Sequence, residues 1–287
     1  MATKGATKFR LSNLKAMLKK NPSERAELSL TSRNLRQIPH DVFTLDGVEI
    51  LLVNSNQLER IPPNIAHMSQ LQVLDASRNN ITLVSENIAQ CARLQELNLS
   101  YNRLSDLPRE LSRLRKFCKL YLKGNEITSI PPVVPTLTPL THLDLAANRL
   151  SILPTSFKNL KRLKVLDLSS NNFEQIPAPV VGMNSLERLD MGFNKIGQYL
   201  SKLDSIEEID VSDCSLKVLN PKVGAMKGLR SLRLARNGLR VLPDEICSLE
   251  NLQTLDVEQN KLEQLPVPCT CYGNYRVSTR LGRPRTD

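Results

Sequence analysis

The chain has 287 residues, no tryptophan, only 4% aromatic residues and a formal net charge of +10. Most of that charge lies at the ends. Residues 1–25 hold seven basic residues against one acidic (net +6), and residues 267–287 hold four against one (net +3), which leaves +1 for residues 26–266. A nucleic-acid groove needs a basic stripe along the body, so this distribution argues against nucleic acid as a partner.

The first predicted element lies within residues 8–20, where Leu11, Leu14 and Leu18 are spaced as on one face of a helix. Asn21-Pro22 is expected to end it. We interpret residues 1–25 as a basic N-terminal capping helix segment, because the ends of repeat proteins need a polar-backed lid. The alternative is a basic amphipathic helix that lies on an anionic membrane or acts as a targeting segment.

From residue 26 onward an asparagine recurs, mostly every 23 residues, and closes the phrase Leu-x-x-Leu-x-Leu-x-x-Asn-x-Leu, as in residues 94–104. The column contains Asn56, Asn79, Asn102, Asn125, Asn148, Asn171, Asn194, Asn237 and Asn260. Arg33 and Cys214 hold the same place in two further coils, and the coil that ends at Cys214 is three residues short. This phrase and period are typical of a leucine-rich repeat solenoid.

The predicted fold class is therefore α/β: a solenoid of about eleven coils, mostly of 23 residues, with a curved parallel sheet on its concave face. Strand leucines point inward and stack between coils, while the asparagine amide bonds backbone groups where the chain leaves the strand. Eight coils continue into a proline-containing turn, which favours an extended convex side. Residues 26–266 are predicted to form one leucine-rich repeat domain, followed by a basic C-terminal tail over residues 267–287.

Motifs for chemistry are missing from the sequence. The three histidines have no metal-ligand spacing, and there is no phosphate-binding glycine loop or nucleophile-elbow serine. We therefore predict no catalytic residue, metal or cofactor, and a protein that is not an enzyme. Four cysteines at repeat positions are expected to be buried thiols of a reduced, cytoplasmic protein: Cys91, Cys118, Cys214 and Cys247.

The outward strand residues can be read from the sequence, because they lie four, two and one positions before each asparagine. They predict two patches for a protein partner on the concave face. The first patch contains Arg78, Asn98, Tyr101, Tyr121 and Lys123, and the second contains Asp144, Asp167, Asp190 and Asp210 with Arg188 and Phe193 at its margin. Aromatic and arginine anchors dominate interface energies. The alternative is that the aspartates only keep the strands soluble and that the rings are isolated surface residues.

The coil length, the Ile/Leu-Pro convex turns, the lack of flanking cysteine caps and the short charged N-terminus together resemble the intracellular leucine-rich repeat proteins. These are typified by the Ras-pathway scaffold, the Ras suppressor protein and the plant Ras-group-related repeat proteins. The resemblance implies a cytoplasmic signalling scaffold or adaptor that binds a protein such as a small GTPase or phosphatase on its concave face. Membrane contact is expected only through the basic N-terminal segment.

Two other functions stay open: a regulatory subunit of a protein phosphatase, and a substrate-recognition component of a ubiquitin ligase complex. The latter would normally need an attached catalytic or adaptor domain. The pattern stops after Pro266. We expect the tail to pack loosely on the last coil, another chain to cover that coil, or the tail to be a variant end.

Overall fold

A computed structural model describes residues 10–196, 203, 205–266 and 276–278. The chain divides into two compact units. The first comprises residues 1–127 and 131–143, and the second comprises residues 128–130 and 144–287. Expectations for residues 1–9, and for the tail apart from residues 276–278, lie outside the described residues. Each unit is described separately.

The first unit begins with a short helix and continues as a series of strands and 3₁₀ helices. Its elements are α1 (Leu11–Met17), β1 (Lys19–Lys20), β2 (Ala26–Ser29), η1 (His40–Thr44), β3 (Ile50–Leu52), β4 (Arg60–Ile61), η2 (Pro63–His67), β5 (Val73–Asp75), β6 (Leu83–Val84), η3 (Glu86–Gln90), β7 (Glu96–Asn98), η4 (Arg109–Arg113), β8 (Lys119–Tyr121) and η5 (Val134–Thr136). The strand β9 (His142–Asp144) lies at the boundary of the units.

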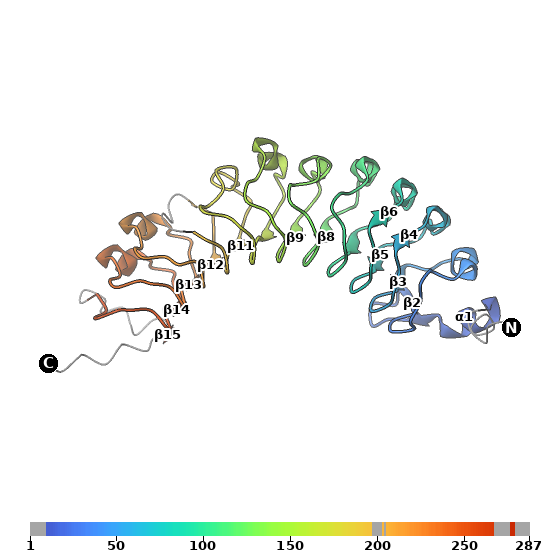
Figure 1. Cartoon of the computed structure of the whole chain (residues 1–287), viewed down its shortest axis with the longest axis horizontal. Helices are drawn as coiled ribbons and strands as arrows, with labels where there is room; N and C mark the ends of the chain where they lie inside the picture. Colours follow the sequence, from blue (N-terminus) through green and yellow to red (C-terminus); the bar gives the residue numbers. More distant parts are fainter. Residues whose placement is uncertain (1–9, 197–202, 204, 267–275, 279–287) are drawn as a thin grey trace. The chain divides into compact units, whose positions relative to one another are not determined.

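The second unit repeats the same alternation. Its elements are η6 (Thr155–Asn159), β10 (Val165–Asp167), β11 (Arg188–Asp190), β12 (Glu208–Asp210), η7 (Pro221–Ala225), β13 (Ser231–Arg233), η8 (Asp244–Ser248), β14 (Thr254–Asp256) and β15 (Arg276–Ser278). In both units the strands of the long sheet line one side of the coils and the 3₁₀ helices line the other (Figure 1). The strands β4 and β6 of the first unit pair in parallel as a separate two-stranded sheet.

Apart from β1, the strands of the long sheet pair in parallel, each with the strand of the next coil along the chain. In the first unit Leu74 lies opposite Leu97, and in the second Leu189 lies opposite Ile209 across the short coil. These central residues are at most 2% exposed, because alternate side chains of a strand point to the same side and each coil covers the inward face of the next. The predicted leucine-rich repeat solenoid, with its long, mostly parallel sheet, is confirmed.

The asparagine column bonds neighbouring coils together. Asn102 Nδ2 donates to the carbonyls of Leu99 (2.9 Å) and Ala76 (3.0 Å), and its Oδ1 accepts the N–H of Ile81 (2.9 Å). The Cys214 thiol instead donates to the Met191 carbonyl at 3.2 Å, so cysteine supplies part of the same function in the short coil. Asparagine is suited to this position because one side chain both donates and accepts.

The prediction of a helix up to residue 20 was wrong at its C-terminal end. The helix α1 ends at Met17, and Lys19–Lys20 pair antiparallel with Ala26 and Glu27 of β2. This pairing supplies hydrogen bonds to β2. The preference of residues 18–20 for a helix does not outweigh these bonds. The Leu14 side chain is fully buried, and the Leu11 N–H donates to Asp41 Oδ2 at 3.0 Å.

Two further features were not anticipated from the sequence. The strand β15 pairs in parallel with β14, and Val277 lies opposite Leu255, so the sheet continues beyond the last recognisable repeat. Cys91, Cys118 and Cys214 are thiols, but Cys247 is disulfide-bonded, so the expectation of a thiol was wrong at that position. Burial raises the pKa of the Cys91 thiol to about 12 and that of Cys214 to about 11, which makes both poor nucleophiles.

Candidate protein-binding face

The residue before each asparagine-column position has a left-handed backbone. All eleven such residues have φ between 50° and 66°: Ser32, Ser55, Arg78, Tyr101, Gly124, Ala147, Ser170, Phe193, Asp213, Arg236 and Gln259. Left-handed backbone costs a non-glycine residue roughly 1–2 kcal/mol. Ten of the eleven coils carry that cost, the exception being the coil with Gly124. The turn leaves the side chain before the column position at the rim of the strand face.

At this rim of the first unit, residues from three neighbouring coils stack on one another. The Arg78 guanidinium carbon lies 4.9 Å from the centroid of the Tyr101 ring. On the other side the ring lies over Gly124, where an added Cβ would come within 2.7 Å of Tyr101 Cδ1. The tyrosine ring is 43% exposed yet held between a cation and a backbone. Its orientation is thus set before any partner arrives.

The remaining members of the first predicted patch have different environments. Asn98 lies opposite Tyr121 in the ladder, but its Oδ1 accepts the N–H of Ser100 at 3.0 Å, which gives this amide a structural role. Tyr121 and Lys123 are half-buried. The structure therefore brings Arg78 and Tyr101 into direct contact and leaves Tyr121 and Lys123 beside them on the same face.

We expect Gly124→Ala to displace the Tyr101 ring and to lower the free energy of unfolding by about 2 kcal/mol, since the new Cβ meets the ring and φ at this residue is +66°. Urea denaturation followed by circular dichroism measures the loss. In a Tyr101→Ala background the same substitution should cost less, because only the backbone strain remains. Equal losses in both backgrounds would show that the ring does not pack on Gly124.

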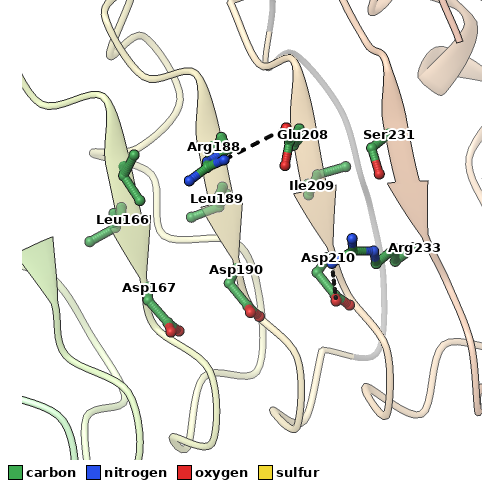
Figure 2. Close-up of a pocket in the computed structure, with 11 residues that line it drawn as sticks. Leu166, Asp167, Arg188, Leu189, Asp190, Glu208, Ile209, Asp210, Ser231 and Arg233 are labelled. Atoms are coloured by element: carbon green, nitrogen blue, oxygen red, sulfur yellow. Dashed lines mark ion pairs between the residues drawn. The ribbon is translucent and has the colours of Figure 1, made fainter. Parts of the chain in front are cut away.

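The aspartates of the second predicted patch form a row at the ends of adjacent strands, and Figure 2 shows three of them, Asp167, Asp190 and Asp210. Asp167 lies opposite Asp190, and Asp190 opposite Asp210. In Asp144, Asp167, Asp190 and Asp210 alike, Oδ1 accepts the backbone N–H two residues later at 2.9 Å. The row thus stabilises the strand exits, whatever else it contacts.

One arginine faces this row, and a second faces a glutamate beside it. Arg233 Nη1 lies 3.8 Å from Asp210 Oδ2, and Arg188 Nη1 lies 3.8 Å from Glu208 Oε1, as the dashed lines of Figure 2 show. Between these side chains lies a shallow hollow of about 200 Å³ across β10 to β13. The second patch is therefore a mixed-charge surface and not the uniformly acidic run that the aspartates alone suggest.

Phe193 marks the rim of this patch and is 56% exposed. The Arg236 guanidinium carbon lies 5.8 Å from the Phe193 ring centroid, and Arg236 Nη2 lies 2.7 Å from Asp213 Oδ2. The hydrogen bond to Asp213 raises the pKa of this guanidinium. The two patches predicted from the sequence did not include Asp213, Arg233 and Arg236, although the coil spacing places all three among the outward strand residues. The signal that could have added them is that this spacing puts opposite charges in adjacent outward positions.

The described residues contain no group of histidine, cysteine and acidic side chains that could hold a metal ion. No helix within the part of the chain that the structure describes is long and apolar enough to cross a membrane.

A stacked repeat with an open, side-chain-rich strand face defines a repeat module, a class that is typically non-catalytic and mediates protein–protein interactions. The family model described as "Leucine rich repeat" matches residues 69–127, 138–196 and 204–262, which together exceed half of the chain. The chain belongs to the leucine-rich repeat family. A search of the curated proteins found no match.

Several solved structures are similar. A leucine-rich repeat protein of Leptospira interrogans is 27% identical, with 81% of this chain and 72% of that chain covered and a TM-score of 0.60. An internalin of Listeria monocytogenes is 17% identical, with 95% and 94% covered and a TM-score of 0.68, which shows the fold alone. The ectodomain of the Arabidopsis receptor kinase HAESA, solved with a peptide hormone, is 25% identical, with 84% and 44% covered and a TM-score of 0.64. This chain thus spans less than half of that ectodomain.

Proposed function

We propose that this chain is a non-enzymatic scaffold or adaptor in intracellular signalling that binds a protein partner through its strand face. The observation that carries the proposal is an aromatic ring paired with an arginine at the strand-exit rim of each unit: Tyr101 with Arg78, and Phe193 with Arg236. Such rings are enriched at the centres of interfaces. The HAESA ectodomain, of the same fold, holds a peptide hormone, which supports a polypeptide ligand here.

Three of the eleven coils show that the fold does not require these rings. Ser32, Ser55 and Ser170 hold the same left-handed position. An exposed aromatic side chain there adds nothing that the turn needs, and its solvent-exposed area favours contact with another protein. We propose a signalling protein as the partner, with a small GTPase or a phosphatase as the two classes to test.

The test is quantitative affinity capture from cells with Tyr101→Ser and with Phe193→Ser. Serine already occupies this position in other coils, so both variants should fold, which circular dichroism checks. We expect each variant to lower recovery of one discrete set of partners about tenfold or more. Ile152→Ser is the matched control, because Ile152 is 74% exposed but lies after the asparagine column, away from the strand face. Unchanged recovery in both serine variants would refute binding through these rings.

The aspartate row needs a different substitution. Arginine at Asp167 or Asp190 would also remove a strand-exit hydrogen bond, so Asp167→Asn with Asp190→Asn is preferable: the amide keeps the acceptor and removes only the charge. A small GTPase partner should be captured to different extents with GTP analogues and with GDP, whereas a phosphatase partner should bring phosphatase activity that does not depend on the nucleotide.

A further inference from the structure

A second surface is formed by the residues that follow the asparagine column in each coil. We call this surface the exit flank. The position four residues after the column is aliphatic and strongly exposed in four coils: Leu83 (59%), Ile152 (74%), Val218 (69%) and Val241 (60%). Val218 and Val241 are one coil apart, and their coils are bonded there by the Gly238 N–H, which donates to the Leu216 carbonyl at 2.7 Å. Leu83 and Ile152 have polar residues at the same position of both adjacent coils.

The coil does not need a valine at this position. Among the described residues, the equivalent position is polar in six coils: Gln37, Arg60, Asp106, Ser129, Gln175 and Gln264. The inward residues on either side, Leu216 and Leu219 in one coil and Leu239 and Leu242 in the next, are at most 2% exposed and supply the core. Two adjacent exposed valines therefore add nothing to folding.

Two cations directly precede the two valines in the sequence: Lys217 and Arg240. Lys195 and Lys261 directly follow the asparagine column in the coils before and after, and all four cations are exposed. Among the described residues none of the four takes part in an ion pair. The strand face of the same coils is different, because Arg230, Arg233 and Arg236 each lie within 3.8 Å of a carboxylate of the preceding coil.

We propose that Lys217, Val218, Arg240 and Val241 form a docking site for an acidic protein segment that carries aliphatic residues beside its carboxylates. Charge complementarity supports this occupant, since the unpaired cations would meet carboxylates while the valines cover aliphatic side chains. An anionic membrane fits less well. Glu174 and Glu263 occupy the position of Lys217 in other coils of this unit, and their carboxylates would face the anionic lipids of a flat surface. A narrow protein segment touches only two coils and avoids this repulsion. The site goes beyond the strand-face function and does not depend on it.

The experiment is selection of phage-displayed random peptides on the full chain, with counter-selection on Val218→Ser/Val241→Ser. We expect enriched peptides to combine Asp or Glu with aliphatic residues. A synthetic copy of the best peptide should bind the double serine variant, and separately Lys217→Glu/Arg240→Glu, about tenfold more weakly in fluorescence anisotropy. Ile152→Ser, the isolated exposed residue of the same column, and Phe193→Ser on the strand face should leave the affinity unchanged.

Three outcomes would overturn the proposal: no enrichment over the counter-selection, enrichment of basic or purely apolar peptides, or equal affinity for the serine variant. Co-sedimentation with phosphatidylserine vesicles that is lost in the serine variant would assign the surface to membranes instead. Circular dichroism checks that each variant is folded. Because Phe193→Ser is measured in the same series, a peptide that binds the strand face is distinguishable from one that binds the exit flank.

Discussion

Replacing Asn102 with alanine is expected to lower the free energy of unfolding by about 3–4 kcal/mol, since buried polar groups that lose their partners cost roughly 1–3 kcal/mol each. The substitution would leave the N–H of Ile81 without its acceptor and the carbonyls of Ala76 and Leu99 without this donor. Asn102 is only 7% exposed, so water cannot readily replace these bonds.

Asn260→Ala is the matched control for this prediction. Asn260 makes the equivalent bonds, with Leu239 at 3.1 Å and with the carbonyls of Leu234 and Val257 at 2.9 and 3.0 Å, but it is less buried. We expect a loss of about half or less, because solvent can satisfy part of the exposed backbone. Urea denaturation monitored by circular dichroism measures both. A loss at Asn102 no larger than that at Asn260 would contradict the importance of burial.

Replacing Gly224 with alanine is expected to cost about 3 kcal/mol, at the upper end for overpacking of a core. Gly224 lies on η7 and is buried against η8, and an added Cβ would overlap the Glu245 carbonyl oxygen and come within 2.8 Å of Glu245 Cβ. These are largely backbone atoms, so no side-chain rotation relieves the overlap, and η7 must move away from η8.

Gly238→Ala provides the comparison in the same unit. Its nearest neighbour would be the Leu216 carbonyl oxygen at 3.3 Å, which a small shift can accommodate, so we expect a loss of about 1 kcal/mol or less. Thermal and urea denaturation of the two variants are compared under the same conditions. Similar stabilities for Gly224→Ala and the unmodified chain would mean that the two 3₁₀ helices are not held in close contact.

The repeat could be predicted from the sequence because its signal is periodic and each coil meets the same constraint. Asn102 must donate and accept at once, and the flanking leucines must point inward, so spacing alone located the strands, the asparagine column and the outward residues. The end of α1 could not be predicted in this way. Lys19 and Lys20 satisfy the pattern of a helix, but a long-range pairing with β2 competes with that local preference.

The contacts within the two predicted patches could be identified only from the structure. The sequence placed Arg78 and Tyr101 in the same column, but the stack depends on a left-handed turn and on the missing side chain of Gly124. In the other patch, no periodicity reveals that Asp190 accepts a backbone N–H. The coil spacing does place Asp210 beside Arg233, but only the structure shows that their charged atoms lie 3.8 Å apart.

The left-handed column has a consequence for how this surface can change. At that position the backbone conformation is the same whether asparagine, Arg33 or Cys214 follows, and the chain places serine, alanine, aspartate, arginine, tyrosine and phenylalanine there with φ within a few degrees of one another. Apart from Gly124, which the Tyr101 ring covers, substitution at the rim is therefore largely uncoupled from folding. At these non-glycine positions the solenoid can acquire or lose a specificity one residue at a time, while the stability of each coil stays nearly constant.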